Sequence, residues 1–179
     1  SPDCASGSDR CADAARQLPQ VDVVVNIQGD EPLLAAEAIE ELLTAFADPS
    51  VEMATLARPL EKGEYENPNV VKLVTAANGD ALYFSRASIP FLRGGGVPQN
   101  ARAHVGIYAF RADFLERDRL HLAGLRDTGA LLHQWRAAGE QLEFLVLESA
   151  GHEGLHELLA ERPLFPFLRV EVTALRPGS

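Results

Sequence analysis

The stretch Val21-Asp22-Val23-Val24-Val25-Asn26-Ile27, followed by Gln28-Gly29-Asp30-Glu31-Pro32, decides how this chain is expected to fold. The first seven residues are mostly β-branched and apolar, a pattern typical of a strand that is covered on both faces. We therefore expect a central parallel strand from Val21 to Ile27. The five residues after it would lie at the carboxyl end of that strand, which is where open α/β sheets bind their ligands.

Helical patterns flank this strand on both sides. Before it, Ser6 to Asp9 fits the capping-box pattern and predicts a helix from about Asp9 to Gln17, which Pro19 ends. After it, the stretch from Leu33 to Ala47 places apolar residues on one face and glutamates on another, as an amphipathic helix does. Two further helices are expected, over Phe114 to Leu122 and Leu131 to Ala138.

The remaining periodic segments are typical of strands. They run over Met53 to Ala57, Val70 to Thr75, Ala81 to Ser85, His104 to Phe110 and Leu142 to Leu147. Ala77-Asn78-Gly79-Asp80 supplies turn residues and predicts a hairpin between the second and third of these strands. The order predicts an α/β fold with a mixed sheet, mostly parallel, that includes an antiparallel hairpin part. We expect residues 1–160 to form one domain and residues 161–179 a divergent tail.

Composition excludes several classes of protein. The chain has 179 residues, of which 46% are hydrophobic and 23% charged, as in one soluble globular domain. A net charge of -10 argues against a nucleic-acid surface. The longest apolar runs fall short of the roughly 20 residues that a membrane-spanning helix needs. No secretory signal is visible at the start of the chain, so we expect a cytoplasmic location, with Cys4 and Cys11 as ordinary thiols.

Asp30 is the strongest candidate for chemistry. Gly29 lets the backbone turn tightly or approach a ligand, and the Asp30 carboxylate is a hard oxygen donor of the kind that holds Mg²⁺ against nucleotide phosphates. The alternative is structural: Gly29-Asp30 makes a turn, and Asp30 or Glu31 caps the helix that follows.

Six segments, in order along the chain, resemble the family of 3-deoxy-manno-octulosonate (Kdo) cytidylyltransferases. They are Ser6 to Arg10, Val24 to Pro32, Met53 to Leu56, Asn67 to Lys72, Ala81 to Pro90 and His104 to Arg111. The resemblance implies a three-layer fold of the nucleotide-diphospho-sugar transferase type. It also implies transfer of CMP from CTP to Kdo with release of pyrophosphate, a step in lipopolysaccharide biosynthesis. A homodimer built around Ala81 to Pro90 and the strand at His104 is implied as well.

The same resemblance assigns roles to single residues. Asp30 would hold Mg²⁺ and be the catalytic residue, while Ser6, Gly7 and Arg10 would lie near the nucleotide. The sugar acid would be held by Gln28, Arg86, His104, Tyr108 and Gln134. Each role has a plainer alternative, since Arg86 could be a solvated charge, His104 an ordinary histidine and Tyr108 a core aromatic. Arg10 could lie along its own helix.

The chain departs from the family pattern at both ends. Family members begin with a strand and a glycine-rich loop that grips the triphosphate, and nothing similar precedes Ser1, so the first βα unit is expected to be missing. The family's second metal-binding aspartate falls near His156, which leaves Glu153 or Glu157 as substitutes. A family glutamate that helps to hold the sugar falls near His133.

Three functions remain open at this point. The first is a cytidylyltransferase acting on Kdo. The second is a transferase for another sugar acid, because the departures lie in the part that contacts the sugar. The third is a degenerate, non-catalytic relative, which His156 in place of an acid favours.

Overall fold

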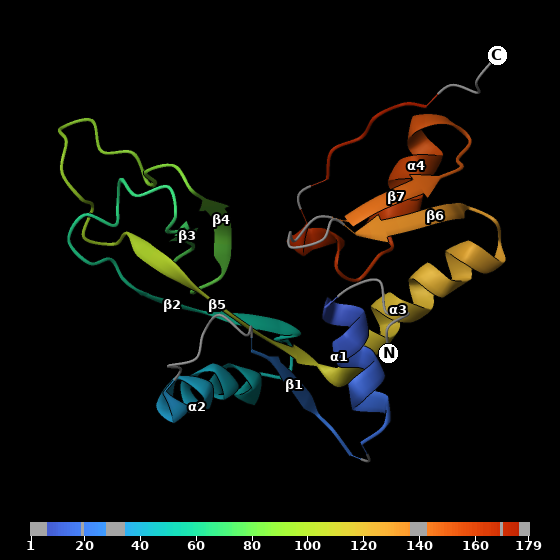
Figure 1. Ribbon diagram of the computed structural model, residues 1–179, viewed down its shortest axis with the longest axis horizontal. Coiled ribbons are helices and arrows are strands. Elements are labelled where there is room, and N and C mark those ends of the chain that lie inside the picture. Colours follow the sequence, from blue (N-terminus) through green and yellow to red (C-terminus); the bar gives the residue numbers. More distant parts are fainter. Residues whose placement is uncertain (1–6, 19, 28–34, 137–142, 169, 176–179) are drawn as a thin grey trace. The chain divides into compact units, whose positions relative to one another are not determined.

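A computed structural model describes residues 7–18, 20–27, 35–136, 143–168 and 170–175 (Figure 1). Backbone alone is described for residues 7–10, 136 and 167. The chain divides into two compact units, residues 23–111 and residues 1–22 together with 112–179. Each unit has its own sheet, so each is built around its own set of strand pairings. The boundary expected at residue 160 stays a prediction.

The unit of residues 23–111, called the sheet unit, is organised around its longest strand. Its five strands are β1 (Val23–Asn26), β2 (Met53–Pro59), β3 (Lys72–Thr75), β4 (Ala81–Ser85) and β5 (Arg102–Arg111). β2 lies along one side of β5, and β1 and β3 pair with opposite ends of its other side. β4 pairs only with β3 among the described strands and therefore lies at the edge.

The prediction of a mostly parallel sheet, with Val21 to Ile27 as a central parallel strand, is wrong for the described strands. All four pairings in this sheet are antiparallel. β1 and β2 do run in the same direction, because each is antiparallel to β5, but β5 stands between them. The alternation of strand, helix and strand gave their common direction correctly. It could not show that a strand from much later in the chain separates them, nor that β1 is only partly buried.

The predicted hairpin between β3 and β4 is confirmed. In its turn the Ala76 amide donates to the Asp80 carbonyl over 2.8 Å. Gly79 has a φ of 96°, which a residue with a Cβ rarely adopts. The Asn78 side-chain amide donates to the Asp80 carboxylate over 2.7 Å. The turn residues therefore act as the sequence indicated.

The core of the sheet unit lies between the sheet and the helix α2 (Ala36–Thr44) with the short 3₁₀ helix η1 (Ala45–Ala47) (Figure 1). Leu42 of α2 packs with Ile107 and Ala109 of β5, and smaller contributions come from Val23, Val25, Phe46, Ala54, Leu56 and Val105. Arg111 then ties the end of β5 to the turn after α2, since its guanidinium donates to the carbonyls of Phe46, Asp48 and Val51. The helix predicted over Leu33 to Ala47 is confirmed from Ala36 onward.

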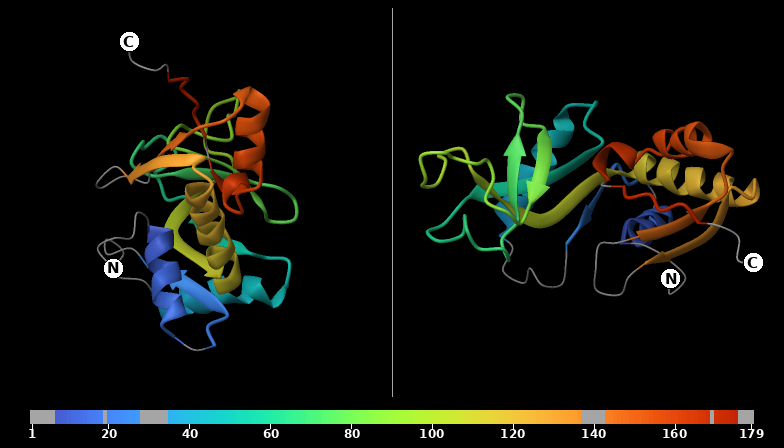
Figure 2. Two further views of the ribbon diagram at one scale, coloured as in Figure 1. Left: turned by 90° about the vertical axis from the view of Figure 1, so that its right-hand side faces the viewer. Right: turned by 90° about the horizontal axis from the view of Figure 1, so that it is seen from above.

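The second unit, called the helical unit, pairs three helices with a two-stranded sheet. Its elements are α1 (Gly7–Arg16), α3 (Ala112–Asp127), β6 (Leu131–Arg136), β7 (Glu143–Leu147), α4 (Gly151–Ala160) and η2 (Phe165–Phe167). Figures 1 and 2 show α4 beside the pair of β6 and β7. The helices expected near α1 and α3 and the strand at β7 are confirmed. No helix in the described ranges is long and apolar enough to cross a bilayer.

The helix predicted over Leu131 to Ala138 is wrong. Its described part is the strand β6, which pairs antiparallel with β7, so that Trp135 lies opposite Phe144. A short apolar run fits a helix and a strand equally well, and here the partner strand decides. Gly129, with a φ of 76°, separates this strand from α3.

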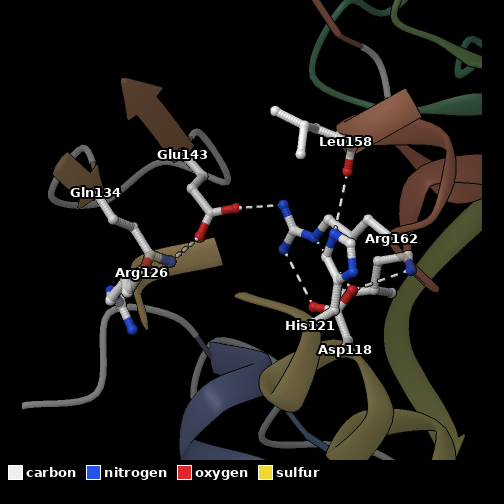
Figure 3. A network of polar contacts seen from close by, with 8 residues as sticks. Asp118, His121, Arg126, Gln134, Glu143, Leu158 and Arg162 are labelled. Carbon is white, nitrogen blue, oxygen red and sulfur yellow. Dashed lines mark hydrogen bonds and ion pairs between the residues drawn. The ribbon is translucent and has the colours of Figure 1, made fainter. Parts of the chain in front are cut away.

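A buried ion network joins α3, β7 and the chain after α4 (Figure 3). The Arg162 guanidinium donates to both carboxylate oxygens of Asp118, over 3.1 and 3.2 Å, and to Glu143 over 2.9 Å. The Leu164 amide also donates to Asp118, over 3.0 Å. Burial acts to lower the pKa of Arg162, but the bonds and charges of Asp118 and Glu143 outweigh it and raise that pKa. The charges of this network are thus satisfied internally.

Candidate functional site

A row of aromatic rings runs along β5 in the sheet unit. The His104 ring lies 5.1 Å from Phe84, edge to face, and 5.4 Å from Tyr108, while Tyr108 stacks 6.4 Å from Phe110. Between His104 and Tyr108 the pairing with β2 becomes irregular, because Leu56 pairs with Val105 whereas Thr55 already pairs with Tyr108. Such irregularities re-aim side chains and are frequent beside functional sites.

Thr55 of β2 contacts His104 directly. Its hydroxyl oxygen lies 2.9 Å from His104 Nε2 and 2.6 Å from the Ile107 carbonyl oxygen. Burial holds the pKa of His104 below its usual value. Sequence reasoning matched Thr55 only as part of a family segment and gave it no role. A hydroxyl in the middle of an apolar strand was the available signal, since a partly buried hydroxyl needs a partner.

Lys72 is a second residue that sequence reasoning left without a role. Its side chain is fully buried, with 0% exposure. Its ammonium donates to the carbonyls of Asn67, Val70 and Arg86, over 2.8, 2.8 and 2.6 Å. Burial, and then the charge of Arg86, lower the pKa of Lys72. These three bonds use all three protons of the ammonium and fix the loop before β3 against the end of β4.

Arg86 is exposed and held at one nitrogen. Its Nη1 donates to the Pro68 and Asn69 carbonyls, over 3.0 and 3.2 Å. Within the described part of the chain, its Nη2 and Nε donate to no protein atom. The start of β3 links Arg86 to His104, because the His104 amide donates to the Val71 carbonyl over 2.8 Å and Lys72 holds the Arg86 carbonyl. The structure thus bonds the backbones of two of the predicted residues to the start of β3.

Several predicted residues lie beyond what the structure describes. Ser6, Gln28 and Asp30 fall outside the described residues, and so does the side chain of Arg10, while Gly7 is described only as the first residue of α1. Their roles stay predictions.

Gln134 belongs to the helical unit, and its amide has partners there (Figure 3). Its Nε2 donates to Glu143 over 2.6 Å, and Arg126 donates to its oxygen. The role of Gln134 in holding the sugar stays a prediction.

A metal site is not evident among the described side chains, where no three His, Cys, Asp or Glu residues are grouped so as to hold an ion. That statement includes α4, where Glu153 and Glu157 are the expected substitutes for the second metal ligand. The expected Mg²⁺ site at Asp30 stays a prediction. A hollow of about 310 Å³ lies between α1 and α3, and none of the predicted site residues with a described side chain lines it.

A family model described as Cytidylyltransferase matches residues 1–122. The chain belongs to the cytidylyltransferase family. The sequence resemblance is therefore confirmed, and the sheet unit lies wholly within the matched residues. A second model, described as Muconolactone delta-isomerase, matches residues 108–178, which is less than half of the chain. The change from one similarity to the other falls at the end of β5 and in α3.

Individual members of the cytidylyltransferase family are similar to most of this chain. A 3-deoxy-manno-octulosonate cytidylyltransferase from Anaeromyxobacter sp. (strain Fw109-5) is 58% identical over 146 residues, covering 81% of this chain and 59% of the relative. Another, from Acidobacterium capsulatum, is 39% identical over 172 residues, covering 89% of this chain and 69% of the relative. The chain spans about three fifths of the length of the first curated relatives it matches.

A solved structure of a family member agrees with these matches. It is a CMP:2-keto-3-deoxy-manno-octonic acid synthetase complexed with CTP, and it superposes with a TM-score of 0.59 at 33% identity. The similarity covers 71% of this chain and 57% of that one. The α/β architecture is therefore shared with this family.

Proposed function

We propose that this chain is part of a nucleotidyltransferase that transfers CMP from CTP to Kdo, giving CMP-Kdo and pyrophosphate for lipopolysaccharide biosynthesis. The observation that carries the proposal is that the backbones of Arg86 and His104 are bonded to Lys72 and Val71, respectively, at the start of β3, within the residues that match the family. Relatives that carry the name of this activity are up to 58% identical to the chain, which supports the same chemistry here.

The side chains at this site suit a sugar acid. A carboxylate is held best by a guanidinium, whose fork matches its two oxygens, and Arg86 has Nη2 and Nε available within the described part of the chain. His104 and Tyr108 add an imidazole and a phenol to the same strand, groups that bond to sugar hydroxyls. In a chain with a net charge of -10, an anionic substrate needs such individually placed cations.

We further propose that Asp30 holds Mg²⁺ together with the nucleotide phosphates, and that Ser6, Gly7 and Arg10 contact the nucleotide. β1 ends at Asn26, whose Cα pairs with Tyr108, and Asp30 follows four residues later. At roughly 3.5 Å per residue, the Asp30 Cα is within about 14 Å of the Asn26 Cα. When bound, Mg²⁺ would offset the negative charge that builds on the phosphates during displacement. The protein residues would hold the two substrates in line.

A homodimer fits the exposed edge of the sheet unit. β4 carries Leu82, Tyr83 and Phe84, with exposures of 64%, 58% and 40%, and Phe91 beyond it is 84% exposed. Side chains on both faces of this edge strand are thus open. A second copy covering β4 would bury them and protect an edge that otherwise invites unspecific pairing. Light scattering of the purified chain, compared with Tyr83→Glu, tests this state.

The decisive experiment measures pyrophosphate release with CTP, Mg²⁺ and Kdo. It should use this chain and, in parallel, this chain extended with the segments of the Anaeromyxobacter relative that lie outside their match. We expect Kdo-dependent release that falls about a hundredfold or more in Asp30→Asn. Asp80→Asn, in the exposed hairpin turn, is the matched control and should keep full activity.

The other outcomes separate the alternatives. Release with another sugar acid but not with Kdo would establish a different substrate. An extended chain that is folded but inert with every sugar acid would establish a non-catalytic relative.

A further inference from the structure

The Thr55 hydroxyl has one proton and three possible hydrogen-bond partners within reach. Its oxygen lies 2.6 Å from the Ile107 carbonyl oxygen, 3.3 Å from the Val105 carbonyl oxygen and 2.9 Å from His104 Nε2. A hydroxyl donates one hydrogen bond and accepts others. The direction of each contact therefore depends on where this one proton lies.

The distances place the proton toward Ile107. Two oxygens at 2.6 Å repel unless a hydrogen lies between them, and a carbonyl has no hydrogen to give. The Thr55 hydroxyl must therefore donate to the Ile107 carbonyl. Its lone pairs remain for His104, and 2.9 Å is the ordinary length of an N–H···O bond. His104 Nε2 consequently carries a hydrogen.

The other ring nitrogen is then an acceptor, provided that the imidazole is neutral. Burial lowers the pKa of His104, and the rings of Phe84 and Tyr108 pack against it. No charged side chain of the described residues bonds to the ring. At neutral pH the ring therefore has a single N–H, at Nε2, and a lone pair at Nδ1.

His104 Nδ1 is open to a ligand. It has no hydrogen-bond partner among the described residues. Since no buried side-chain nitrogen or oxygen in those residues lacks a partner, Nδ1 must reach solvent. A ligand hydroxyl is the complementary group, because it can donate to this lone pair.

We propose that Thr55 is a positioning residue that holds His104 as its Nε2–H tautomer, so that Nδ1 accepts a hydrogen bond from a hydroxyl of the sugar acid. The identity of that ligand rests on the proposed function, whereas the tautomer does not. Because Thr55 and Ile107 come from neighbouring strands at the irregular pairing, the position of the imidazole is set by the sheet itself.

The test is nitrogen-15 NMR of the His104 imidazole at neutral pH, in the wild-type chain, Thr55→Val and Thr55→Ser. We expect the wild type and Thr55→Ser to show protonated Nε2 and unprotonated Nδ1. In Thr55→Val, which keeps the shape but loses the hydroxyl, the ring should exchange between both tautomers. A wild-type ring with its hydrogen on Nδ1, or an unchanged tautomer in a folded Thr55→Val, would overturn the positioning role.

Titration with Kdo tests the ligand separately. Kdo should move the Nδ1 resonance of the wild type, and its apparent dissociation constant should rise about fivefold in Thr55→Val but not in Thr55→Ser. A wild-type Nδ1 that does not respond to Kdo while its tautomer is as expected would overturn the ligand assignment and count against the proposed substrate. The wild-type tautomer is read without ligand, so failure of the proposed function remains distinguishable from failure of the positioning role.

Discussion

The two units differ in whether their buried polar side chains and the groups beside them have all their bonding partners within the protein. In the helical unit, Arg162 is enclosed by Asp118 and Glu143, and every charge of this network has a partner inside the protein. In the sheet unit, Lys72 and Thr55 are bonded to backbone carbonyls, while Arg86 Nη2 and Nε and His104 Nδ1 have no protein partner among the described residues. A closed network stabilises, whereas an incomplete one can bind, and this difference supports the site proposed in the sheet unit.

The largest expected effect is in the closed network. Arg162→Met should lower the free energy of unfolding of the helical unit by about 3–5 kcal/mol, because it leaves the buried Asp118 carboxylate unpaired. Trp135, the single tryptophan, lies in that unit and reports its unfolding by fluorescence in urea. Arg119→Met breaks a half-exposed pair with Glu116 and should cost less than about 1 kcal/mol. Equal costs in the two variants would show that the buried network stabilises the helical unit no more than an exposed ion pair does.

The second largest expected effect is on the stability of the sheet unit. Lys72→Met leaves three carbonyls without their buried donor and should destabilise this unit by about 3 kcal/mol. Urea unfolding followed by tyrosine fluorescence is the measurement, since all three tyrosines lie within residues 23–111. Lys62→Met, at an exposed position, should change stability by about 0.5 kcal/mol or less. If Lys72→Met left the stability unchanged, the three bonds of this ammonium would not stabilise the sheet unit.

Arg86→Lys should affect binding and not stability. The substitution keeps the charge but removes the fork, so the dissociation constant for Kdo should rise about tenfold. The midpoint of urea unfolding should stay unchanged, because the Arg86 side chain is exposed. Calorimetric titration measures the binding, and Arg93→Lys, also exposed, is the control. Equal losses in both variants would mean that the weaker binding is not specific to Arg86.

The smallest expected effect is on how the stability of the sheet unit depends on pH. Bonds from Arg58, at 2.6 and 2.7 Å, and from the Glu61 amide lower the pKa of Glu64 from 4.5 to about 2. A carboxyl with a lowered folded pKa stabilises the fold above its unfolded pKa. This contribution should be lost as the pH falls from about 4.5 toward 2. Glu64→Gln should flatten that part of the tyrosine-monitored stability profile, and an unchanged slope would contradict the assignment.

The sequence predicted most elements of the sheet unit and the turn of its hairpin, because period and turn residues are local properties. It failed where a distant partner decides: β5 separates β1 from β2, and β7 makes a strand of Leu131 to Arg136. The site shows the same limit. Arg86 and His104 could be proposed from family resemblance, but the roles of Thr55 and Lys72 depend on backbone carbonyls that only the folded sheet brings to them.

Lys72 also gives the protein a built-in chemical reporter. The chain has two lysines, of which Lys62 is exposed and Lys72 has no accessible surface. An amine-reactive reagent should therefore modify Lys62 at once and Lys72 only when the sheet opens. The rate at which Lys72 is labelled would measure how often β3 and the end of β4 come apart, and slower labelling in the presence of Kdo would show that an occupied site keeps them closed.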